Sequence, residues 1–137
     1  MLTMVQRGHT CVELCQGKAV VINDGRGFEV SRRDRNTAQA GCPMQLLTGA
    51  LGACIVLTLD AVAQNKGIAL SNLRVRLNYT TKGSETCFQV ELELEGDLSD
   101  REKKILFQSA RTCEVGKVLT GNVEIHYSLQ QPEAASQ

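Results

Sequence analysis

Two cysteines, Cys54 and Cys113, are the residues of this 137-residue sequence that are best suited to do chemistry. Cys54 lies in an almost uncharged run, where an apolar environment raises the pKa of a thiol unless a cation or hydrogen-bond donor stabilises the thiolate. Cys113 follows Leu106 and Ala110 at helical spacing, so its side chain is expected to face a core. Two inward-facing thiols are either inert small hydrophobic residues or a redox pair that the fold brings together.

The other four cysteines are expected to pack or to be tolerated at the surface: Cys11, Cys15, Cys42 and Cys87. Cys42 precedes Cys54 by twelve residues, or about 18 Å along a continuous helix, too far for a direct disulfide. The spacing of Cys11 and Cys15, in a strand-like stretch, does not suit a zinc site, and the two histidines lie far apart in sequence. Neither a metal nor another cofactor is therefore expected.

Composition restricts the class of protein further. A chain of this length fits one domain, residues 1–137, in which about residues 130–137 form a loose tail. Fifteen basic and fifteen acidic residues give no net charge to attract nucleic acid or an anionic membrane. Tryptophan is absent, and the three phenylalanines and two tyrosines are scattered, so the chain lacks an aromatic platform for stacking bases. No nucleic-acid partner is expected.

The first seven residues lack the basic and apolar pattern of a secretory signal, so a cytoplasmic location is expected. A reducing cytoplasm favours free thiols or a catalytic pair over a framework of structural disulfides. The apolar run from Leu46 to Leu59 contains two glycines and two threonines and falls short of the ~20 residues of a membrane-spanning helix. We therefore expect no membrane association.

A buried central helix is predicted to begin at Pro43 and to end at Gly67, a residue able to adopt the left-handed cap. Apolar residues occupy every side of this helix. In so small a chain, a sheet can bury one side while a second subunit buries the other, which predicts a homodimer.

Strands are predicted on both sides of this helix. The stretches 3–14, 18–23 and 27–31 precede it, and a hairpin over 72–95 follows it with period-two alternation of apolar and polar residues. The hairpin's polar face places Arg74 and Arg76 opposite Glu91 and Glu93, an arrangement we assign to the surface.

The capping box Ser99-Asp-Arg-Glu102 predicts a second helix, which continues through Cys113 and ends at Gly116 or Gly121. Residues 123–127 alternate as a closing strand. The predicted fold class is α+β with antiparallel pairing.

Four stretches give the sequence a resemblance to the OsmC/Ohr family, the osmotically inducible and organic hydroperoxide resistance proteins: residues 43–47, 51–54, 110–113 and 117–121. The resemblance implies antiparallel sheets packed on a long central helix in an intertwined homodimer. It also implies that Cys54 attacks an organic or hydrogen peroxide substrate and that Cys113 resolves the sulfenic acid as a disulfide. An external dithiol would then reduce that disulfide.

The sequence departs from the family pattern at two positions. Met44 or Gln45 stands where peroxidase members carry a glutamate, and Cys15 stands near the position of an activating arginine. Other cations lie in the first third of the chain, each expected to be solvated and none assigned to the site: Arg7, Lys18, Arg26, Arg32, Arg33 and Arg35. Two alternatives therefore stay open, a non-catalytic dimer that binds a small ligand or senses redox state, and a fold in which both cysteines only fill the core.

Overall fold

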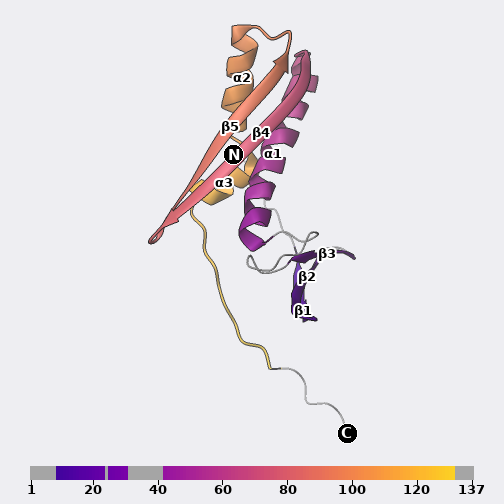
Figure 1. The fold of residues 1–137 in the computed structure, drawn as a ribbon, viewed down its shortest axis with the longest axis vertical. Coiled ribbons are helices and arrows are strands. Elements are labelled where there is room, and N and C mark those ends of the chain that lie inside the picture. Colours follow the sequence, from indigo (N-terminus) through magenta and orange to yellow (C-terminus); the bar gives the residue numbers. More distant parts are fainter. Residues whose placement is uncertain (1–8, 24, 31–41, 132–137) are drawn as a thin grey trace, which may run out of the picture.

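The computed structural model describes residues 9–23, 25–30 and 42–131. The elements follow in the order β1 (Cys11–Cys15), β2 (Lys18–Asn23), β3 (Arg26–Val30), α1 (Pro43–Lys66), β4 (Leu70–Lys82), β5 (Glu85–Gly96), α2 (Asp100–Ala110) and α3 (Glu114–Thr120). Strands β1–β3 form one antiparallel sheet and β4–β5 form another. The predicted α+β class is confirmed, and Figure 1 shows α1 running beside the long β4–β5 hairpin.

The predicted N-terminal strands appear as a short meander. The first strand was predicted over 3–14, and β1 spans Cys11–Cys15. Residues 3–8 of that prediction lie outside the described part of the chain. β2 agrees with the predicted 18–23, and β3 begins one residue before the predicted 27–31, whose last residue lies outside the described part. Figure 1 places this meander near the N-terminal end of α1.

Helix α1 begins and ends as its sequence predicts. Pro43 takes the first helical position, and the Cys42 N–H donates to Gln45 Oε1 at 3.0 Å. Gly67 ends the helix in the left-handed conformation (φ 65°), and the Ile68 N–H donates to the Ala63 carbonyl. One face of α1 is buried against β4, α2 and α3, and its residues repeat about once per turn: Leu51, Ile55, Leu59 and Ala63.

By length and composition, the 24-residue helix α1 is apolar enough to cross a membrane, with a mean hydropathy of 2.0 over an 18-residue window. The sequence-based expectation considered only residues 46–59 and therefore underestimated the apolar length of the helix. In the structure, the buried face of α1 forms the centre of the domain core, together with Leu106 of α2. In the structure, 33% of that apolar window is buried.

The β4–β5 hairpin has the register that the alternation predicts. Arg74 pairs with Glu93 and Arg76 with Glu91 across the two strands, and both arginines reach the Glu93 carboxylate. These side chains are more than two-fifths exposed, so the ion pairs contribute only a few tenths of a kcal/mol each, roughly. The opposite face of β4 packs on α1, which confirms the predicted sheet-on-helix contact.

The chain breaks the predicted second helix into two. The capping box is present, because the Glu102 N–H donates to Ser99 Oγ and the Ser99 N–H donates to Glu102 Oε1. However, α2 ends at Ala110, and Cys113 stands outside it as the N-cap residue of α3. The prediction that Cys113 belongs to the same helix as Leu106 was wrong, although Cys113 is buried as expected, at 2% exposure. Gly116 lies inside α3, and Gly121 caps its C-terminal end.

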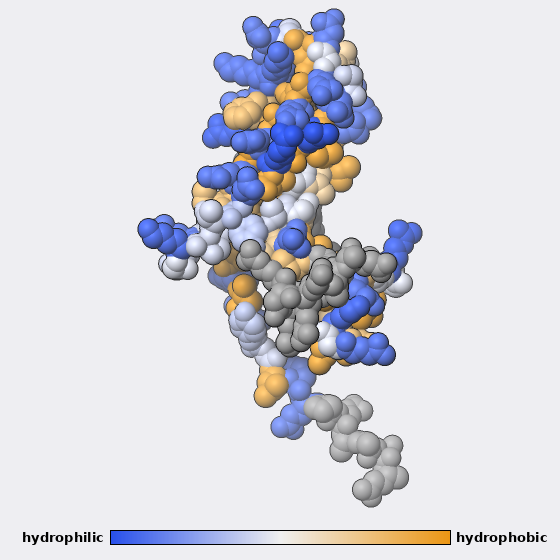
Figure 2. Space-filling view, viewed as in Figure 1, coloured by the Kyte–Doolittle hydropathy of each residue, from blue (hydrophilic) through white to orange (hydrophobic). Residues whose placement is uncertain are grey.

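The predicted closing strand is absent from the described chain. Residues 122–131 form no helix or strand, and Figure 1 shows them running away from the body. Their apolar side chains stay exposed, from 57% at Val123 to 93% at Leu129. In Figure 2, hydrophobic residues stand uncovered along this extension. A strand requires a partner edge, and none of the described strands pairs with this segment.

Candidate functional site

The two cysteines singled out in the sequence meet at the first turn of α3. The Val115 N–H donates to Cys54 Sγ at an N···S distance of 3.5 Å. The next N–H along the chain, that of Gly116, donates to Cys113 Sγ at 3.4 Å. Consecutive peptide groups therefore hold the two sulfur atoms, which come from positions 59 residues apart in sequence (113 − 54).

Cys54 also affects the ionisation of the Cys113 thiol. Burial raises the pKa of the Cys113 thiol, the Gly116 N–H lowers it, and the charge and hydrogen bonding of Cys54 raise it again, for a net increase. The net increase favours the protonated form of the Cys113 thiol. Cys113 is therefore less suited than an ordinary thiol to react as the thiolate.

Gly116 is a residue of the site that the sequence analysis missed. A Cβ atom at this position would lie 3.0 Å from Cys113 Sγ and 3.8 Å from Leu51 Cδ1, so a side chain there would press on the sulfur. A signal was present in the stretch Cys113-Glu-Val-Gly116. If cysteine is considered as an N-cap residue, the glutamate that follows it is typical of the first turn of a helix.

Met44 and Gln45, which occupy the expected glutamate positions, have other roles in the structure. The side-chain Oε1 of Gln45 accepts a hydrogen bond from the Cys42 N–H at the start of α1. Met44 lines a cavity of about 610 Å³ that also contains Cys87 and Phe88 from β5. Neither residue hydrogen-bonds to Cys54 within the described part of the chain.

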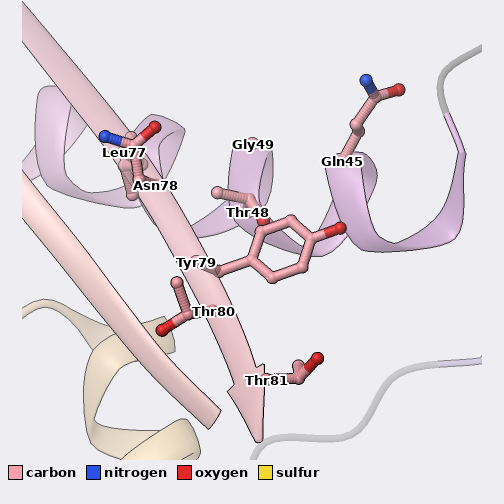
Figure 3. A pocket seen from close by; sticks show the side chains of 8 residues that line it. All are labelled: Gln45, Thr48, Gly49, Leu77, Asn78, Tyr79, Thr80 and Thr81. Carbon is pink, nitrogen blue, oxygen red and sulfur yellow. The ribbon is translucent and has the colours of Figure 1, made fainter.

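Gln45 also borders an open, partly polar cavity of about 560 Å³ between α1 and β4. Figure 3 shows Tyr79 reaching from β4 across this cavity toward the first turns of α1. Neither Cys54 nor Cys113 lines this cavity. It is therefore separate from the pair of thiols.

The candidate activating cations are placed only in part. Lys18 pairs with Glu29 across β2 and β3 at 3.3 Å, an exposed contact. Arg26 begins β3, whereas four of the arginines lie outside the described residues: Arg7, Arg32, Arg33 and Arg35. Among the described residues, the hydrogen-bond donors to the two sulfurs are the backbone N–H groups of Val115 and Gly116.

All six cysteines are free thiols in the described part of the chain. Cys11 and Cys15 lie exposed at the two ends of β1, Cys87 is exposed on β5, and Cys42 is buried at the start of α1. Within the described residues, no three side chains of the kinds that bind metals come together.

Comparison with known proteins adds one family match. A model of the family described as OsmC-like protein matches residues 36–128, about two thirds of the chain. No curated protein sequence matches the chain. Among solved structures, an OsmC-like protein from Mycoplasma pneumoniae is similar at 20% identity with a TM-score of 0.74, covering 86% of this chain and 90% of its own.

Two further solved structures are organic hydroperoxide resistance proteins. The one from Elizabethkingia anophelis shares 17% identity over 90% of this chain and 94% of its own, with a TM-score of 0.65. OhrB of Bacillus subtilis shares 20% identity over 87% of this chain and 94% of its own, with a TM-score of 0.58. At these identities the likeness shows a common fold.

Proposed function

The chain belongs to the OsmC-like protein family, and from that premise we propose that it is a thiol-dependent peroxidase that reduces organic hydroperoxides or hydrogen peroxide. The observation that carries the proposal is the meeting of Cys54 and Cys113 at consecutive N–H groups of α3. The structural neighbours named for organic hydroperoxide resistance support a peroxide-related role.

The proposed reaction begins at Cys54. Its thiolate attacks the peroxide oxygen, the O–O bond breaks, and the second oxygen leaves with a proton as an alcohol or water. Cys54 then carries a sulfenic acid. The Cys113 sulfur attacks the Cys54 sulfur, water leaves, and a disulfide forms before further oxidation to sulfinic acid. A dithiol from solution reduces this disulfide by two exchanges and restores both thiols.

Cys54 is assigned the attacking role because its neighbour is held protonated. The raised pKa of Cys113 leaves that residue less suited to attack peroxide as a thiolate. The Val115 N–H is placed to stabilise negative charge on Cys54 Sγ. Because an N–H group gives less stabilisation than an arginine and glutamate network, we expect slower turnover than in a family member with both groups.

A homodimer is part of the proposal, since one side of α1 is exposed among the described residues. Four exposed residues follow one another at helical spacing and form the apolar stripe: Leu46, Ala50, Ala53 and Leu57. Leu57 alone is 68% exposed. A second copy of the chain would cover this stripe, and the exposed, alternating segment 122–131 could add as a strand to the sheet of that copy. We propose that this dimer acts in the cytoplasm.

The alternative is a dimer that binds a small ligand or senses redox state without turnover. The observation that favours it is the absence of a carboxylate at Met44 and Gln45, with Gln45 engaged in capping α1. In this alternative, the same two thiols respond to oxidants too slowly for catalysis.

Peroxide consumption by wild-type protein and three variants separates these functions. With excess dithiothreitol as reductant, Cys54→Ser is expected to abolish consumption, whereas Cys87→Ser, at an exposed thiol away from the pair, retains it. In a separate reaction without reductant, Cys113→Ser is expected to complete the first oxidation and then to accumulate sulfenic and sulfinic acid at Cys54. Wild-type protein that consumes peroxide no faster than Cys54→Ser would contradict the peroxidase function and favour the alternative.

A further inference from the structure

A small apolar cavity lies beside the thiol pair, bounded by α1, β5, α2 and α3. Its volume is about 280 Å³, at the lower end of the roughly 300–1,000 Å³ of pockets that bind small molecules. Its lining is mainly aliphatic and aromatic: Leu51, Ile55, Val90, Leu92, Phe107 and Ala110, with Arg111, Cys113, Gly116 and Thr120. We call it the Cys113 pocket.

The pocket reaches one sulfur of the pair and not the other. Cys113 is part of its wall, whereas Cys54 is not. On α1, the pocket is lined by Leu51 and Ile55, and Cys54 lies on an adjacent face of the helix, where Val115 contacts it. Because Cys113 is only 2% exposed, a small molecule needs a cavity that leads to the sulfur, and the Cys113 pocket is such a cavity.

The lining also indicates what kind of molecule fits. Phe107 and Val90 are half-exposed apolar residues at the pocket, and Leu51, Ile55 and Leu92 are more deeply placed. Arg111 is the one charged residue in this lining, at the exposed C-terminal end of α2. An apolar chain with an anionic group at one end is complementary to such a surface.

We propose that the external reductant enters through the Cys113 pocket as an aliphatic thiol with an anionic end and attacks Cys113, not Cys54. The inference rests on the proposed function, because it concerns the disulfide which that function creates. The thiolate of the reductant bonds to Cys113 Sγ, the Cys54–Cys113 bond breaks, and its electron pair leaves on Cys54 as a thiolate. A second thiol of the reductant then attacks the reductant's own sulfur and releases Cys113.

The direction of exchange agrees with the surroundings of the two sulfurs. A thiol with a raised pKa is the poorer leaving group, and burial raises the pKa of Cys113. Attack on Cys113 instead releases Cys54, whose thiolate is received by the Val115 N–H. Access and leaving-group chemistry therefore favour the same sulfur.

The test starts from disulfide made with diamide, so it does not depend on peroxide turnover. The oxidised protein is mixed with 6-mercaptohexanoate, 6-mercaptohexan-1-ol or 2-mercaptoethanol, quenched in acid, and mapped by mass spectrometry. We expect the mixed disulfide on Cys113 and free thiol at Cys54. We also expect 6-mercaptohexanoate to react a few fold faster than 6-mercaptohexan-1-ol, the size of effect that an exposed charge pair gives. This preference should be lost in Arg111→Gln. An adduct found mainly on Cys54 would overturn the proposal.

Two matched substitutions test the path itself. Val90→Phe narrows the pocket from its half-exposed wall, whereas Val118→Phe makes the same change at an exposed position of α3 outside the lining. We expect Val90→Phe to slow the six-carbon thiols about tenfold or more, as for a misfitted apolar pocket, and to affect 2-mercaptoethanol less. Val118→Phe should leave all three rates unchanged. Equal rates in both variants would refute the path, while failure of the peroxidase function would show only in the peroxide assay.

Discussion

Substitution of Gly116 by alanine tests the placement of the Cys113 sulfur. The added Cβ would lie 3.0 Å from Cys113 Sγ, so the sulfur or the helix must shift by a few tenths of an ångström. Overpacking of this kind costs about 1–3 kcal/mol, whereas replacing a helical glycine by alanine contributes about 0.5–1 kcal/mol of stability. The balance predicts that Gly116→Ala lowers the free energy of unfolding by about 0–2.5 kcal/mol.

A double-mutant cycle isolates the contact from the helix effect. In a Cys113→Ala background the sulfur is gone, so Gly116→Ala should raise the free energy of unfolding by about 0.5–1 kcal/mol. The coupling energy between the two positions is then about 1–3 kcal/mol, the overpacking cost alone. Urea unfolding of the four proteins under reducing conditions provides the free energies.

The cycle has a clear negative result. If Gly116→Ala stabilises the protein equally with and without the Cys113 sulfur, the sulfur does not lie against Gly116. The geometry of the candidate site would then be wrong, even if the fold were right. A loss of stability in both backgrounds would instead place the clash on Leu51, the other neighbour of the added methyl group.

Three further predictions concern the dimer and the thiols. Leu57→Glu should weaken the dimer roughly a hundredfold, since two symmetry-related leucines each lose about 1.5 kcal/mol of burial free energy. Sedimentation at several concentrations measures the dissociation constant, and a stable wild-type monomer at micromolar concentration would contradict the shared interface. Ile125→Asp should also weaken the dimer whereas His126→Asp should not, because the two side chains lie on opposite faces of an extended segment. Light scattering measures the dimer fraction, and an equal loss of dimer in both variants would exclude strand addition. Cys54→Ser should lower the pH at which Cys113 reacts with iodoacetamide, since Cys54 raises the pKa of Cys113. Site-resolved mass spectrometry measures this pH profile, and an unchanged profile would show that Cys54 does not affect the ionisation of Cys113.

The sequence predicted the elements whose stabilising groups are close together in the chain. Pro43 and Gly67 mark the ends of α1, the capping box marks the start of α2, and alternation sets the register of β4 with β5. Each of these signals depends on neighbours a few residues away or on a short hairpin connection. Local chemistry was therefore sufficient for them.

The break between α2 and α3 was not predicted because helical spacing continues through it. Leu106, Ala110 and Cys113 suit one helical face, yet the backbone turns at residues 111–112, and Cys113 starts a new helix. Cysteine is an uncommon N-cap residue, so its role was hidden. The burial of Cys113 was predicted correctly by reasoning from the wrong element.

The C-terminal alternation shows a different limit. Val123, Ile125 and Tyr127 have the spacing of a strand, but their backbone finds no partner within the described chain. Sequence pattern indicates that a segment is suited to a sheet, whereas pairing depends on an available edge. The contact of Cys54 with Val115 likewise depends on tertiary packing and could not be read from spacing; only the resemblance to a family suggested that the two thiols meet.

Peptide mapping of the wild-type protein after brief treatment with a small excess of cumene hydroperoxide tests the proposed peroxidase chemistry most directly. We predict one new intramolecular disulfide, between Cys54 and Cys113, with the other four cysteines still reduced. In Cys113→Ser the same treatment should give sulfenic and then sulfinic acid at Cys54. A Cys54 that stays an unmodified thiol in the wild-type protein, under conditions that oxidise exposed cysteines, would contradict the central claim.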